Sequence, residues 1–114
     1  MTAVERMGHV IRLKPEAAAD YRRLHAAVWP EVLALLGACN IRNYTIFLEE
    51  SEHLLFAYWE YVGTDFAADM DRMKADPLMR DWWALTDPMQ TPLGSRAPGA
   101  WWARMEPVFH TGTV

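Results

Sequence analysis

The stretch DYRRLHAAVWPE, residues 20–31, carries a phenol, an imidazole and an indole at equal intervals. Residues four apart lie on one face of an α-helix, so Tyr21, His25 and Trp29 would form one row. Imidazole, with an ordinary pKa of ~6.5, can donate or accept a proton near neutral pH. His25 is therefore a candidate catalytic acid–base, although the same row also fits the buried stripe of an amphipathic helix.

Further aromatic side chains come from two other segments of the chain. Tyr44 lies in an alternating apolar segment, and Trp82 and Trp83 lie in a later helical one. Flat apolar rings suit the C–H faces of a sugar, and phenol and indole groups bond its hydroxyls. These residues fit an aromatic cavity around His25 that takes a neutral small molecule, but periodicity alone favours packing in the core.

Other kinds of site lack the residues that they need. The four histidines show no spacing typical of a metal site, and the six glycines occur singly rather than in a phosphate-binding loop. Cys39 has only Arg42 as a nearby basic residue, which argues against a cysteine nucleophile. We expect neither a metal nor a cofactor.

Length, charge and cysteine content set outer limits on the function. The 114 residues suit a single domain, residues 1–114. The net charge of −4 includes no basic cluster, so nucleic acid and membranes are not expected partners. One cysteine, no signal peptide and no apolar run of ~18 residues predict a cytoplasmic protein.

The first half of the chain predicts a strand, a long helix and a hairpin. Residues 7–13 alternate, with Met7, His9 and Ile11 on one face. Pro15 suits a helix start, and the helical pattern runs to Gly37 with a kink or restart at Pro30.

The segments 41–49 and 53–61 predict the hairpin that follows. The first segment alternates, with Tyr44, Ile46 and Leu48 on one face. The second is apolar on both faces, so we expect helices to cover one face and a partner subunit the other. A homodimer is therefore expected.

The second half predicts two helical segments, a loop and a last strand. Thr64 is expected to cap a helix over 66–75, and Asp76 with Pro77 starts another that ends at Pro88. Residues 89–100 read as a loop, and 106–111 as a last strand. The order βαββαβ predicts an α+β, ferredoxin-like sandwich with an antiparallel sheet.

Several stretches of the sequence resemble those of the L-rhamnose mutarotases over nearly the whole chain. The three longest are YRRLHAAVWPE at Tyr21–Glu31, NYTIFL at Asn43–Leu48 and WWALTD at Trp82–Asp87. LLFA at Leu54–Ala57 and the closing Glu106–Phe109 also match. Each piece is short, but their combination is specific.

The resemblance implies a cofactor-free aldose 1-epimerase, a homodimer of the dimeric α/β barrel type that interconverts the α and β anomers of L-rhamnose. It implies that His25 is the proton donor and that four residues bind the substrate: Tyr21, Tyr44, Trp82 and Trp83. Ala26-Ala27 and the long segment 89–104 depart from the family pattern. The sugar could therefore be L-rhamnose or a similar 6-deoxy sugar.

Two other functions fit the same residues. One is a non-enzymatic dimeric sugar-binding or sensor domain, in which His25 only holds the ligand; sugar binding without anomer exchange would distinguish it. The other, suggested by the fold alone, is a cofactor-free monooxygenase, which would consume oxygen with a phenolic substrate.

Overall fold

A five-stranded antiparallel sheet organises the computed structural model, with β1 (Glu5–Leu13) near its centre. β3 (Leu54–Tyr61) pairs with one side of β1, and β2 (Ile41–Glu49) pairs with β3. The short strands β4 (Gln90–Thr91) and β5 (Ala103–Met105) both pair with the other side of β1. The predicted hairpin and the antiparallel sheet are therefore confirmed.

The structure describes residues 4–112, so residues 1–3 and 113–114 of the expected domain lie outside the described part.

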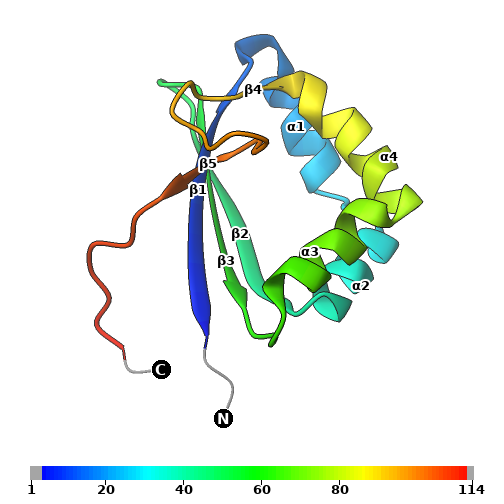
Figure 1. Cartoon of the computed structure of the whole chain (residues 1–114). Helices are drawn as coiled ribbons and strands as arrows, with labels where there is room; N and C mark the ends of the chain where they lie inside the picture. The colour runs from blue at the N-terminus through cyan, green and yellow to red at the C-terminus, as the bar shows by residue number, and fades with distance from the viewer. Residues whose placement is uncertain (1–3, 113–114) are drawn as a thin grey trace.

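The helices all lie on one side of this sheet (Figure 1). They are α1 (Ala18–His25), α2 (Pro30–Ala38), α3 (Phe66–Ala75) and α4 (Pro77–Thr86), with short 3-10 turns η1 (Pro15–Ala17) and η2 (Asp87–Met89). Helices α1 and α2 connect β1 to β2, and α3 and α4 connect β3 to the last strands. The predicted α+β, ferredoxin-like order is confirmed.

The first helix is interrupted rather than continuous. Helix α1 ends at His25, the backbone is extended at Trp29 (φ −57°, ψ 131°), and α2 begins at Pro30. Proline disfavours helical geometry in the residue before it, so the restart predicted at Pro30 is confirmed. The single row of three aromatic rings is wrong, because Trp29 lies outside the helix that carries Tyr21 and His25.

Aspartates cap the two helices of the second half. The Asp76 side chain accepts from the backbone N–H groups of Leu78 and Met79, as predicted. Helix α3 is capped by Asp65, whose side chain accepts from the N–H of Ala68. The cap predicted at Thr64 is therefore one residue too early.

The last strand is shorter and earlier than the sequence indicates. In this last part of the chain, Ala103–Met105 pairs with β1, while residues 106–111 form no strand. Pro107 has no N–H to donate to a ladder. Val108 and Phe109 are 89% and 81% exposed, so the prediction of a strand over 106–111 is wrong.

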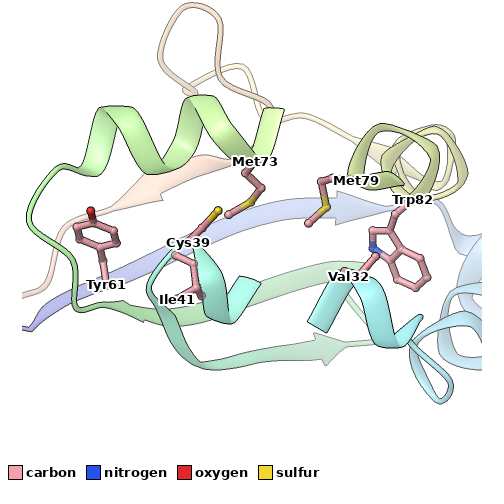
Figure 2. Packing of buried hydrophobic residues seen from close by; sticks show 7 residues of the cluster. All are labelled: Val32, Cys39, Ile41, Tyr61, Met73, Met79 and Trp82. Carbon is pink, nitrogen blue, oxygen red and sulfur yellow. The ribbon is translucent and has the colours of Figure 1, made fainter. Parts of the chain in front are cut away.

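Buried side chains form two clusters between the sheet and the helices. Figure 2 shows the first cluster, where Met73 and Met79 point from α3 and α4 toward side chains of α2 and β2. The second cluster packs Ile11 and Leu13 of β1 with Leu55 of β3 and Tyr21 of α1. No helix within residues 4–112 is both long and apolar enough to span a membrane.

Candidate active site

The predicted proton donor and the four predicted substrate-binding residues all line one cavity of about 310 Å³. Tyr21 and His25 come from α1, Tyr44 from β2, and Trp82 and Trp83 from α4. Small-molecule sites begin at volumes of about 300 Å³. Two further hollows adjoin this cavity, since Tyr44 and Trp83 line all three. The fold therefore brings the candidate residues together from three elements.

His25 joins the two core clusters at the wall of the cavity. Its ring stacks on Tyr21 of the second cluster, with ring centroids 4.0 Å apart. It also contacts Trp82 of the first cluster in a T-shaped arrangement, with centroids 5.4 Å apart. The i, i+4 spacing of Tyr21 and His25 on α1 produces this contact.

A backbone hydrogen bond sets the proton positions on His25. Its Nδ1 lies 2.9 Å from the carbonyl oxygen of Tyr21. A carbonyl only accepts, so Nδ1 carries the proton, and in the neutral ring Nε2 is the free base. Burial lowers the pKa of His25 below its usual 6.5, and the Tyr21 bond opposes part of this shift. The neutral form with a basic Nε2 therefore dominates at pH 7.

The two tryptophans of α4 differ in their surroundings. Trp82 is only 6% exposed and packs edge-on against Trp29, with centroids 5.1 Å apart. Trp83 is half-buried and borders all three hollows. Trp82 therefore belongs mainly to the core, whereas Trp83 presents more surface to a ligand.

Tyr44 sits at an irregular point of β2. The ladder between β2 and β3 shifts register between Arg42 and Thr45, and Asn43 adopts a positive φ of 53°. Such bulges reorient a side chain, and Tyr44 here stacks over Trp59 at 6.4 Å. Loss of hydration raises the pKa of the Tyr44 hydroxyl to about 12, although 41% of the residue as a whole is exposed.

Other residues that the sequence analysis did not assign to the site also line the cavity, among them Asp87, Gln90 and Trp101. Burial raises the pKa of Asp87 above its usual value. Two adjacent tryptophans, Trp101 and Trp102, in a loop rich in glycine and proline could have indicated a binding role for that loop. Nothing in the sequence singled out Gln90.

Within the described residues, no group of three or more His, Cys, Asp or Glu side chains is placed to hold a metal ion. Cys39 is a free, fully buried thiol in the first cluster. Burial raises its pKa, which leaves it protonated and packed rather than reactive.

Comparison with known proteins identifies the family. The family model described as L-rhamnose mutarotase matches residues 6–111. The chain belongs to the L-rhamnose mutarotase family. One relative, the L-rhamnose mutarotase of Verminephrobacter eiseniae, is 42% identical over 82 residues, which cover 72% of this chain and 74% of the relative.

Other members of the family match over a longer span. The L-rhamnose mutarotase of Burkholderia ambifaria is 36% identical over 109 residues, which cover 94% of this chain and 98% of the relative. The crystal structure of an L-rhamnose mutarotase from Formosa agariphila superimposes with a TM-score of 0.73, covering 95% of this chain and 99% of that one. At 23% identity, this likeness shows the shared fold.

Proposed function

We propose that this protein is an aldose 1-epimerase that interconverts the α and β anomers of L-rhamnose or a similar 6-deoxy sugar. Membership of the L-rhamnose mutarotase family supports the reaction type. The observation that carries the proposal is the cavity in which one oriented, neutral imidazole lies among aromatic rings.

Anomer exchange needs one proton to move from the anomeric hydroxyl to the ring oxygen. Nε2 of His25 takes the hydroxyl proton as the bond between the anomeric carbon and the ring oxygen breaks, with its electron pair passing to the ring oxygen. The resulting imidazolium delivers the proton to that oxygen, which leaves an open-chain aldehyde. Rotation and reclosure on the other face give the second anomer, so His25 serves as base and then as acid.

The aromatic residues hold the sugar around this proton shuttle. Trp83 offers a ring face for the C–H groups of the sugar. Tyr44 and Tyr21 offer phenol groups that stay neutral, because burial raises the pKa of both. Trp82 packs edge-to-face with His25 and also lines the cavity.

Saturation-transfer NMR of L-rhamnose tests the proposal, because it measures exchange between the anomers directly. We expect His25→Asn to reduce the protein-dependent exchange by ~10²–10⁴-fold, the usual contribution of general acid–base catalysis. His53→Asn is the matched control, since His53 is exposed and its positive φ of 55° suits asparagine.

Equal exchange by His25→Asn and the wild type at saturating sugar would contradict the assignment of His25. Rhamnose binding without enhanced exchange by the wild type would contradict the enzyme and favour a sugar-binding domain.

We also propose that the protein is a homodimer formed through the face of the sheet that the helices leave uncovered. Phe47 of β2 and its cross-strand partner Phe56 of β3 both lie on that face, and Phe47 is 60% exposed. The segment after β5 adds the exposed apolar residues Val108 and Phe109. A second copy of the chain would cover these side chains, which are costly to leave in water.

A further inference from the structure

A buried amide links the long loop of the chain to the proposed catalytic helix. Gln90 is only 5% exposed. Its Oε1 accepts a hydrogen bond from the indole Nε1 of Trp101 at 2.8 Å, and its Nε2 donates to the hydroxyl oxygen of Tyr21 at 3.3 Å. All three side chains line the cavity that contains His25.

The two hydrogen bonds from Trp101 to Gln90 and from Gln90 to Tyr21 form a chain, which we call the relay. The chemistry of the indole fixes its direction. An indole N–H can only donate, so the carbonyl oxygen of Gln90 must face Trp101 and its NH₂ group must face Tyr21. The Tyr21 oxygen then accepts, and its own proton has to point away from Gln90. Because burial raises the pKa of Tyr21, the phenol keeps this proton at neutral pH.

We propose that Gln90, oriented by Trp101, is a positioning residue that makes Tyr21 a hydrogen-bond donor toward a sugar oxygen in the cavity. This inference rests on the proposed function. Tyr21 stacks on His25, so a sugar oxygen that accepts from Tyr21 is held beside the imidazole.

The same relay connects the loop between β4 and β5 to the site. In Figure 1 this loop turns back toward the space between the sheet and α1. Within the loop, Arg96 donates hydrogen bonds to the carbonyl of Leu93, and the N–H of Ala100 donates to the carbonyl of Ala97. The Trp101 hydrogen bond to Gln90 ties this segment to the cavity wall, and Trp102 packs against the cluster that contains Tyr21. The loop thus helps to set the orientation of Tyr21.

Gln90→Glu reverses the hydrogen bond to Tyr21, and leaves the bond from Trp101 in place, with almost no change in shape. A carboxylate accepts from both Trp101 and Tyr21, so Tyr21 would turn its proton toward it and lose its donor role. We expect L-rhamnose exchange at neutral pH to fall roughly 10–100-fold, as for one lost hydrogen bond in the transition state. Thr91→Glu adds the same charge at the neighbouring exposed position and should keep wild-type exchange.

The pH profile separates this role from a merely structural one. As the introduced carboxyl becomes protonated, its O–H donates to Tyr21 and its C=O accepts from Trp101, which restores the pattern of the amide. The ratio of Gln90→Glu exchange to wild-type exchange should therefore rise as the pH falls. A ratio equal to that of Thr91→Glu at every pH would overturn the inference.

A second variant keeps the test valid if the buried carboxyl unfolds the protein. Trp101→Phe keeps an aromatic ring but removes the indole N–H together with its five-membered ring, so the amide of Gln90 is free to flip. We expect roughly 3–10-fold slower exchange than wild type, in line with one neutral hydrogen bond. Exchange equal to wild type would overturn the role of Trp101 and with it the relay.

Two further measurements distinguish failure of the relay from failure of the proposed function. In ¹⁵N NMR, the indole N–H signal of Trp101 should shift and exchange faster with solvent in Gln90→Met, while that of Trp102 stays in place. If the wild type does not enhance exchange, the proposed function fails and rhamnose affinity becomes the readout. The inference then requires weaker binding by Gln90→Glu that recovers at acid pH, and unchanged or absent binding overturns it.

Discussion

At the scale of single residues, the position of a side chain on its helix decides what it contacts. Tyr21 supplies both a ring that stacks on His25 and a carbonyl that orients it. Trp82 and Trp83 are chemically identical and adjacent, yet one is 6% exposed and the other half-buried. Successive residues on a helix point about 100° apart, so the two rings serve different purposes.

This difference predicts separable effects of the two tryptophans. Trp82→Ala should lower the free energy of unfolding by ~3–5 kcal/mol, because it removes a buried ring and leaves a cavity. Trp83→Ala should mainly weaken rhamnose binding, by ~1–3 kcal/mol if its ring stacks on the sugar. Urea denaturation and calorimetry measure the two quantities.

Leu85→Ala, on the exposed side of the same helix, is the control for both. Unchanged rhamnose affinity in Trp83→Ala would place that ring outside the binding site.

At the scale of elements, one carboxylate accepts hydrogen bonds from three parts of the fold. Asp69 of α3 accepts from Tyr61 at the end of β3, from Asn40 in the turn before β2 and from Arg72 on its own helix. Arg72 also donates to the carbonyl of Ala38 at the end of α2. These hydrogen bonds, led by the one from Tyr61, lower the pKa of Asp69 from 3.8 to about 2.

The stability should depend on pH through this carboxylate. A carboxyl whose pKa is lower in the folded state stabilises the protein above its unfolded pKa and loses that contribution as pH falls through the folded value. Asp69→Asn should therefore be less stable than wild type at pH 7, with a gap that closes between about pH 3.8 and 2. Urea denaturation at several pH values measures the gap.

Asp71→Asn is the control, since Asp71 is exposed on the same helix. A gap between Asp69→Asn and wild type that stays constant down to pH 2 would show that the charge of Asp69 is not what holds these elements together.

At the scale of the whole molecule, the sheet is covered on one face only. The helices lie on that face (Figure 1), and cavity residues such as Tyr21, Trp82 and Trp83 come from them. The other face presents Phe56 of β3 and the exposed Phe47 of β2. An antiparallel sheet that faces water normally shows polar side chains there. The apolar character of this face is the reason for proposing a dimer.

Sedimentation velocity tests the dimer. Phe47→Lys should raise the dissociation constant at least tenfold, because it places a charge in the interface core, and should leave the monomer folded. Leu85→Lys makes a similar change at an exposed position of α4 and should leave association unaffected. A wild-type protein that stays monomeric at micromolar concentration would refute the dimer.

The sequence by itself determined the features that depend on near neighbours. Alternation placed β1 and β2, a segment that is apolar on both faces placed β3, and Asp76 with Pro77 placed the start of α4. The spacing of Tyr21 and His25 placed two site residues on one face. Such features follow from steric and hydrogen-bonding rules that act over about four residues.

Only the tertiary structure decided which distant residues meet. Gln90 reaches Tyr21 across 69 positions of sequence, and the last strand is set by its pairing with β1. The competing stretch 106–111 contains apolar residues typical of a strand, but Pro107 cannot complete a ladder. These outcomes depend on the free energy of the whole packed sheet, and local sequence rules do not contain that quantity.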